Sequence, residues 1–225
     1  MFRNEEQLVE SFIEYTPSSV WTRSEDGANV RTTFETTCSE GRADWVWAAS
    51  ARGWNHGLTE QVAELLQNPT SSLVLSLLKT DAVRTENYLR NRTGVSRTTL
   101  RRIITELIES GLVAAPSDGR FVLGENFEVP DVEICAFEFK LDNWRRAFYQ
   151  ATRYRSFSHR VYVVMPSSTV HRTLNWLASF RQQNIGLLSH SPDKGSTRVL
   201  PSRKRHPGSR SGFIRAVGML HQQGD

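Results

Sequence analysis

Cysteine is scarce in this chain, which has only Cys38 and Cys135 among its 225 residues. The two lie in separate segments, without a CxxC pair or a nearby pair of histidines. Such spacing supports neither a disulfide framework nor a structural zinc site. Because a chain without disulfides suits a reducing compartment, we expect a cytoplasmic protein.

Long hydrophobic runs are missing as well. No apolar stretch approaches the roughly 20 residues of a membrane-spanning helix, and the N-terminal MFRNEEQLVE lacks the apolar core of a signal peptide. The six histidines are scattered without paired spacing, so none is assigned a catalytic or metal-binding role. With 38% hydrophobic and 23% charged residues, the chain is expected to be globular and to have no membrane partner.

Lysine is rare, and the basic residues that give a net charge of +4 are nearly all arginine. They cluster at Arg97–Arg102, Arg145–Arg160 and Arg198–Arg215. Arginine makes planar, bidentate contacts to phosphate, so this bias favours a nucleic-acid partner. A solvated basic surface is the competing explanation, and charge alone does not separate the two.

The outer parts of the chain alternate between helical and strand patterns. Residues 4–15 predict a helix capped by Asn4, and residues 29–38 and 42–49 predict a hairpin. The patterns after Pro130 predict a strand at 133–141, a helix at 142–157 capped by Asp142, a strand at 161–165, a helix at 169–183, a strand at 185–188, a loop at 201–212 and a helix at 213–223.

The middle of the chain, residues 59–111, has helical patterns throughout and ends at Gly111. A short hairpin follows, indicated by Asp118-Gly119. Helix, helix, turn, arginine-led helix and hairpin is the order of a winged helix. On the arginine-led helix, Leu100, Ile103, Ile104, Leu107 and Ile108 are expected to face the core.

The same helix is a candidate DNA reader, because recognition helices read bases through their N-terminal side chains. Its first turns and the wing hairpin supply the candidate DNA-binding residues Ser96, Arg97, Thr98, Thr99, Arg101, Arg102 and Arg120. Asp118 lies on the same wing. The alternative is that the winged helix docks a protein instead.

Two opposite charges, Glu138 and Lys140, lie in the apolar run 133–141. Side chains alternate along a strand, so both should point to one face, with Phe137, Phe139 and Leu141 on the other. Burying them is costly unless they pair or bind something. A carboxylate for Mg²⁺ beside an ammonium is what metal-assisted phosphodiester cleavage needs. A surface ion pair is the plain alternative.

Three motifs occur in a recognisable order: Asp44 in GRADWVWA, Glu138-Phe139-Lys140, and Gln150-x-x-x-Tyr154 on the following helix. Together they resemble the PD-(D/E)XK nuclease superfamily, whose restriction-endonuclease-like core is a helix, three strands, a helix and a further strand. The Gln-x-x-x-Tyr pair resembles that of RecB-like members. The likeness covers residues 1–50 and 130–190, with no matching motif beyond Ser191.

The resemblance implies a metal site. Asp44, Glu138 and the backbone carbonyl of Phe139 would share Mg²⁺, or Mn²⁺ in its place. Glu6, or with less support Glu5, would add an accessory acid from the first helix. The ordinary explanations are that Asp44 only leaves a turn and that Glu6 is a first-turn helix acid.

The resemblance also implies roles for three other catalytic candidates. Lys140 would hold the attacking water, and Gln150 and Tyr154 would orient the site or touch the nucleic-acid backbone. Since Gln150 and Tyr154 are four residues apart, they share one helix face. Tyr154 also fits an apolar stripe with Phe148 and Ala151.

We therefore expect a mixed α+β fold: a restriction-endonuclease-like central mixed sheet flanked by helices, interrupted by a winged-helix insertion. The nuclease-like domain would comprise residues 1–50 and 130–225, and the insertion residues 51–129. The expected function is metal-dependent cleavage of double-stranded DNA, with a homodimer as one route to a double-strand break. The alternatives are a DNA-binding regulator or an adaptor on an inactive scaffold. The basic segment 198–210 is expected to be a flexible loop, either solvated or closing over DNA.

Overall fold

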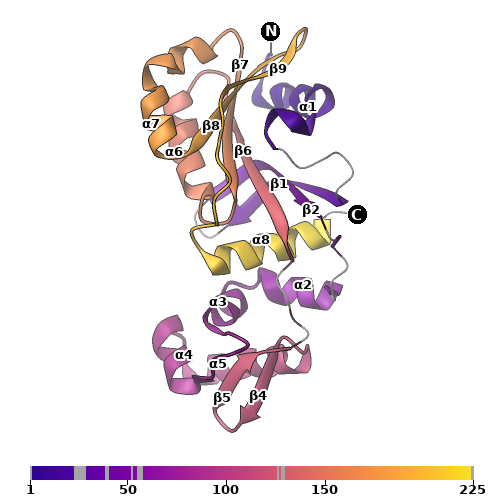
Figure 1. The fold of residues 1–225 in the computed structure, drawn as a ribbon, viewed down its shortest axis with the longest axis vertical. Coiled ribbons are helices and arrows are strands. Elements are labelled where there is room, and N and C mark those ends of the chain that lie inside the picture. The colour runs from indigo at the N-terminus through magenta and orange to yellow at the C-terminus, as the bar shows by residue number, and fades with distance from the viewer. Residues whose placement is uncertain are drawn as a thin grey trace.

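The computed structural model describes residues 2–22, 29–38, 41–51, 53–54, 58–125, 127 and 130–223. These residues form a mixed α+β fold with two sheets (Figure 1). In chain order the elements are α1 (Glu5–Tyr15), β1 (Asn29–Cys38), β2 (Gly41–Ser50), α2 (Glu60–Gln67), α3 (Pro69–Leu77), β3 (Arg84–Thr85), α4 (Glu86–Thr93), α5 (Arg97–Glu109), β4 (Val113–Ser117), β5 (Arg120–Leu123), β6 (Val132–Phe139), α6 (Trp144–Tyr154), β7 (Arg160–Pro166), α7 (Leu177–Gln182), β8 (Ile185–Ser191), β9 (Gly195–Leu200) and α8 (Arg210–Gln223). Short 3₁₀ helices occupy Ser18–Val20 and Val170–Trp176.

The larger sheet has the strand order β1-β2-β6-β7-β8-β9. Its β1, β2 and β6 are antiparallel neighbours, β6, β7 and β8 run parallel, and β9 returns antiparallel to β8. Strand β6 lies inside the sheet, and all of its residues are buried. Helix α1 lies on one side of the sheet and helices α6 and α7 on the other (Figure 1).

Alternation along β6 divides its side chains between two apolar clusters. Phe137 and Phe139 pack with Phe12 of α1, and Leu141 is partly buried against the same cluster. Ala136 belongs to the cluster that includes Ala147 of α6. The predicted division is confirmed, since Phe137, Phe139 and Leu141 face α1 and the even-numbered residues face α6.

Local capping explains where the helices flanking this sheet begin. Asn4 caps α1, as predicted, by accepting the Gln7 N–H at 2.9 Å. Helix α6 is capped by Asn143, which accepts the Arg146 N–H at 3.2 Å. The predicted cap, Asp142, lies one residue too early. Both residue types cap well, and the choice between neighbours depends on the backbone angle at which the chain leaves β6.

The smaller sheet, with the order β3-β5-β4, lies between β2 and β6 in the sequence. Ser96 caps α5 by accepting the Thr99 N–H at 3.1 Å. The predicted apolar face of α5 is buried except for Ile108, which is 38% exposed because it lies at the edge of that face. The order α3, α4, α5 and the β4–β5 hairpin follows the sequence prediction, whereas the two-residue strand β3 (Arg84–Thr85) was not predicted.

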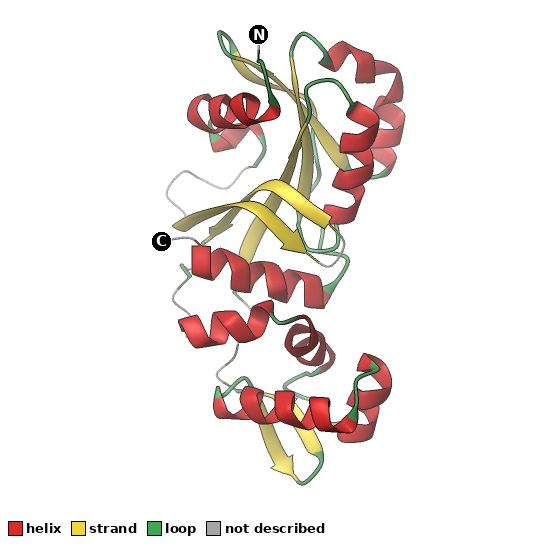
Figure 2. Cartoon of the chain, turned by 180° about the vertical axis from the view of Figure 1, so that it is seen from behind, coloured by secondary structure: helices red, strands yellow, loops and turns green. Residues whose placement is uncertain are grey.

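Helix α8 joins the two parts of the chain. It lies between the larger sheet and helix α2 (Figure 2). At Gly218 the two helices approach so closely that a Cβ atom there would be 2.7 Å from the carbonyl oxygen of Ala63. Arg215 Nε also donates to the carbonyl of Gln67 at 3.1 Å. Helix α2, placed by sequence in the 51–129 insertion, therefore packs on the C-terminal helix.

The segment after β8 differs from the sequence prediction. Strand β9 was not predicted, and α8 begins at Arg210 rather than at residue 213. The expected flexible loop is instead tied to the rest of the molecule, since Arg203 N donates to Asn184 Oδ1 at 2.9 Å and Arg205 N donates to the carbonyl of His159 at 3.1 Å. These partners lie far back in the sequence, which is why local composition did not reveal them.

Candidate active site

A polar cluster lies where β6 ends. Glu138 is 0% exposed and Lys140 is 8% exposed, although both carry ionisable side chains. The Lys140 ammonium lies 2.9 Å from Glu5 Oε2, 3.0 Å from Glu138 Oε1 and 3.8 Å from Asp44 Oδ2. It also donates to the carbonyl of Phe139 at 2.8 Å. One buried cation thus has four oxygen atoms around it, which come from α1, β2 and β6.

Strand pairing brings Asp44 to this cluster. Trp45 lies opposite Phe137 in the antiparallel β2–β6 pair, which places Asp44 opposite Glu138. Asp44 Oδ2 accepts the Phe139 N–H at 2.8 Å. Burial raises the pKa of Asp44 above its ordinary value, although the Phe139 N–H and Lys140 act in the opposite direction. The two acids are therefore adjacent despite the long insertion between their strands.

Lys140 remains a cation in this setting. Burial by itself lowers the pKa of Lys140, but the charges of Asp44 and Glu138 and the contact with Glu5 raise it above its ordinary value. The ammonium therefore has enough acidic neighbours to stay protonated. Its removal would leave several carboxylates facing one another without compensation.

Tyr154 of α6 fixes the second oxygen of Glu138. Its hydroxyl lies 2.5 Å from Glu138 Oε2 and 2.6 Å from the carbonyl oxygen of Arg42. A hydroxyl has one proton, so it can donate to only one of these two acceptors. Both short contacts are satisfied when Glu138 is protonated and donates to Tyr154, which in turn donates to Arg42.

The charge environment agrees with a protonated Glu138. Burial, and then the neighbouring charge of Asp44, raise the pKa of Glu138 to about 7. Tyr154 keeps its proton, because burial and Glu138 raise its pKa. Glu138 Oε1 accepts no hydrogen bond within the described chain, although Lys140 Nζ lies 3.0 Å away, so the two form an ion pair only when Glu138 is ionised. One buried carboxylate oxygen is thus available to another ligand.

A cavity of about 360 Å³ opens beside the cluster. Four residues of α6 line it, Arg146, Gln150, Arg153 and Tyr154, which recur at helical spacing on one face of the helix. Among the described residues, neither arginine has an acid within salt-bridge distance, and the buried Gln150 Oε1 has no donor. The cavity therefore combines acids at one wall with unpaired guanidinium groups at another.

The donors present are suited to Mg²⁺, a hard cation that typically takes one or two carboxylates from a protein and completes its shell with water and phosphate. Asp44 and the free Oε1 of Glu138 are such donors. Within the described parts of the chain, no three Asp, Glu, His or Cys side chains converge as a ready-made chelating group. Lys140 contacts all three acids and the Phe139 carbonyl, so it holds the central position itself.

Five of the predicted catalytic residues are brought together here: Asp44, Glu138, Lys140, Gln150 and Tyr154. The accessory acid is a correction. Glu6 is exposed and does not line this cavity, whereas Glu5 contacts Lys140. Both Glu5 and Glu6 line a neighbouring cavity of about 430 Å³ with Asp44, and of the two it is Glu5 that contacts Lys140. Arg146 and Arg153 were missed, although their spacing from Gln150 could have indicated them.

The predicted DNA-binding residues are on the surface, but the three arginines of α5 already pair with glutamates. Arg97 and Arg101 pair with Glu86 at 2.7 and 3.2 Å. Arg102 pairs with Glu106 at 2.5 Å. The Ser96 and Thr99 hydroxyls bond each other at 2.8 Å at the helix cap, while Thr98 and Arg120 are exposed. The surface position of these residues is therefore as predicted, whereas the pairing of the arginines with glutamates was not predicted.

Comparisons with known proteins point to no relative: no family model, no curated protein and no solved structure matches the chain. In the described segments, no helix has the length and apolar character needed to cross a membrane. The case for a function therefore depends on the geometry around Lys140.

Proposed function

We propose that this protein is a metal-dependent DNA endonuclease, which hydrolyses phosphodiester bonds at the cluster formed by Asp44, Glu138 and Lys140. One observation carries the proposal. Lys140, Asp44 and two unpaired arginines line one cavity of about 360 Å³, and the buried Glu138 lies 3.0 Å from the Lys140 ammonium. A purely structural ion pair does not require a cavity, nor arginines without acid partners on its rim.

Each residue has a role that follows from its surroundings. Arg146 and Arg153 would hold a phosphate at the cavity rim, since arginine contacts phosphate oxygens in bidentate fashion. Lys140 would orient the attacking water by donating from its ammonium. Tyr154 would hold Glu138 in place through their 2.5 Å contact.

The cofactor we propose is Mg²⁺, held by Asp44 and Glu138, with Mn²⁺ as a substitute. When bound there, the ion would lower the pKa of a bound water and neutralise charge on the reacting phosphate. Glu138 must be ionised to act as a ligand, and its pKa of about 7 makes that possible near neutral pH. Glu5 would keep Lys140 in position when Glu138 binds the ion, because Glu5 Oε2 accepts a hydrogen bond from the Lys140 ammonium at 2.9 Å.

The inserted helices have a separate proposed task, which is to bring the site to duplex DNA through α5 and the wing. For this, phosphate must displace Glu86 from Arg97 and Arg101, and Glu106 from Arg102. Because an existing ion pair must be broken first, each arginine contributes less to the free energy of DNA binding. The same pairing favours a second candidate, an adaptor in which α5 docks a protein. Each pair is largely exposed on its arginine side, so exchange of partners is not blocked.

The experiment that tests the proposal is cleavage of supercoiled and linear DNA with Mg²⁺, Mn²⁺ or EDTA. We expect metal-dependent cleavage that is lost in Lys140→Met and Glu138→Gln. The matched control is Glu14→Gln, which changes an exposed acid of α1 that lines neither this cavity nor the neighbouring one beside Asp44. If the protein binds DNA but does not cleave it with any metal ion, the function would instead be that of a DNA-binding regulator on an inactive scaffold. The absence of both DNA binding and cleavage would favour the adaptor.

A further inference from the structure

The C-terminal part of the chain has an unusual charge distribution. Residues 194–224 contain no aspartate or glutamate, yet they include Lys194, Lys204 and five arginines. The part between β9 and α8, residues 201–209, crosses the ends of β6 and β7 that lie opposite the candidate active site. We call residues 198–206, which end β9 and begin this crossing, the basic strap.

The basic strap has a fixed backbone. Asn184 holds Arg203 twice, because Asn184 Nδ2 donates to the Arg203 carbonyl at 2.7 Å and Asn184 Oδ1 accepts the Arg203 N–H at 2.9 Å. Ser202 Oγ accepts the Val161 N–H at 3.2 Å. Arg205 N donates to His159 O at 3.1 Å. A charged segment held in one conformation loses less conformational entropy on binding than a free loop does.

Two of the cations near the strap are anchored by one buried acid. Glu133 is 8% exposed and accepts from Arg160 Nε at 2.5 Å. Its other oxygen lies 3.2 Å from Lys204 Nζ. One carboxylate cannot neutralise both cations, so the pair carries a net positive charge at a fixed position.

The remaining cations of the strap are not neutralised. Arg198, Arg203 and Arg205 are exposed, and the described chain places no acid within salt-bridge distance of them. This contrasts with α5, where Arg97 and Arg101 share Glu86. The strap therefore carries unneutralised positive charge, whereas the three arginines of α5 are paired with glutamates.

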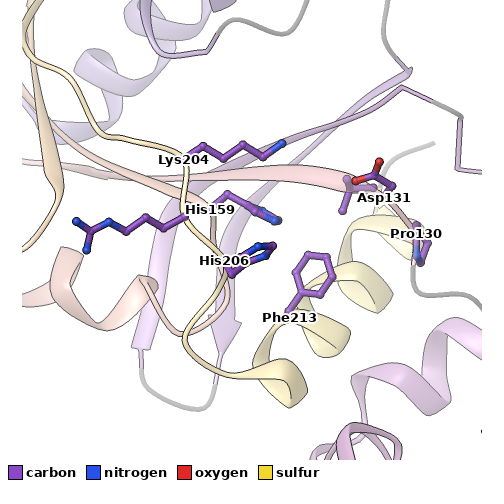
Figure 3. Close-up of a pocket in the computed structure, with 8 residues that line it drawn as sticks. Pro130, Asp131, His159, Lys204, His206 and Phe213 are labelled. Atoms are coloured by element: carbon purple, nitrogen blue, oxygen red, sulfur yellow. The ribbon is translucent and has the colours of Figure 1, made fainter. Parts of the chain in front are cut away.

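Cavities border the strap on both sides. One, of about 440 Å³, is lined by Arg160, Arg198, Arg203 and Lys204. Another, of about 570 Å³, is lined by Lys204, Arg205, His159, His206 and Phe213, together with one acid, Asp131 (Figure 3). His159 Nδ1 accepts the Ile134 N–H at 3.0 Å, so its other ring nitrogen carries the proton and is a donor.

We propose that the basic strap is a second phosphate-binding surface, and that its ligand is the phosphodiester backbone of a nucleic acid. Glu133 and Glu138 are five residues apart on β6, a separation of about 17 Å, or about five base pairs of duplex. This distance is measured along the strand, and Glu133 and Glu138 point to opposite faces of the sheet, so the strap is a surface separate from the Lys140 cavity. The inference rests on the proposed function for the choice of partner, but not on cleavage.

The test is binding of a fluorescent duplex, measured in EDTA over a range of salt concentrations, for Arg198→Gln/Arg203→Gln. Lys204 and Arg160 are left intact, because their loss would leave Glu133 buried without partners. Since each lost phosphate contact lowers the salt slope by about 0.9, we expect a slope smaller by about 1.8 and affinity about 10- to 100-fold weaker at moderate salt. The charge-matched control is Arg172→Gln/Arg181→Gln, with expected binding equal to that of the parent.

Lysine substitution guards against a folding artefact. Arg198→Lys/Arg203→Lys keeps the charge and should retain most of the affinity and the full salt slope. An unchanged slope in the glutamine variant would overturn the proposal. So would inorganic phosphate or ATP competing as effectively as the duplex, because the strap would then be a small-anion site. Cleavage by the parent is scored separately, so a protein that binds through the strap without cleaving refutes the nuclease and not the strap.

Discussion

Two buried glutamates on one strand, Glu133 and Glu138, are expected to respond in opposite ways to the same substitution. Burial and Asp44 raise the pKa of Glu138 from 4.5 to about 7. Burial also acts to raise the pKa of Glu133, but Arg160 and Lys204 outweigh it and hold that pKa below its ordinary value. Glu138 is thus more stable protonated in the folded protein, and Glu133 more stable charged.

The sign follows from proton linkage. A raised folded pKa contributes stability that is complete below pH 4.5 and is lost as the pH rises to about 7. Glutamine resembles the protonated acid and does not titrate. Glu138→Gln should therefore stabilise the metal-free protein, by about 3 kcal/mol at pH 8 and by only about 1 kcal/mol at pH 5. Glu133→Gln should instead destabilise it by about 3 kcal/mol, because it leaves the largely buried Arg160 without its acid partner.

The assay is urea unfolding in EDTA at both pH values, for the parent and the two variants, with the free energy of unfolding taken from each curve. At pH 8 we expect a higher midpoint for Glu138→Gln and a lower one for Glu133→Gln. If Glu138→Gln lowers stability at pH 8, or changes it equally at both pH values, the reasoning is refuted. Glu138 would then be an ordinary ion-pair partner of Lys140. Its ionised form would have no unfavourable free energy of burial for a bound metal ion to offset.

Three further predictions concern α1, α5 and α8. Glu5→Gln should reduce the single-turnover rate of DNA cleavage at least tenfold, whereas the rate of Glu6→Gln should stay close to that of the parent. Equal effects of the two substitutions would contradict the placement of Glu5 at the cluster. Glu86→Gln should tighten duplex binding, because it frees two arginines of α5, and weaker or unchanged binding would favour docking of a protein by that helix. Gly218→Ala should lower stability by about 1–3 kcal/mol in urea unfolding, since the added Cβ meets a helix carbonyl; Gly212→Ala, with a nearest contact of 3.3 Å, is the control and should change it less.

Local patterns in the sequence were sufficient for much of the architecture. Alternation in 133–141 correctly divided the side chains of β6 between two faces, since a strand has a period of two wherever it is placed. Asn4 and Ser96 were found as caps, because a cap satisfies N–H groups only two or three residues away. The apolar stripe of α5 was correct apart from Ile108 at its edge. All of these depend on neighbours within a few residues.

The tertiary structure alone decided which residues meet. The register of β2 against β6 placed Asp44 beside Glu138 across a long insertion, and the rotation of α1 on the sheet selected Glu5 over Glu6. The fixed path of the basic strap and the packing of α8 on α2 depend on Asn184 and Gly218, which are distant in sequence from their partners. Local sequence determines which face a side chain takes on its own element. Close packing of whole elements determines what that face meets.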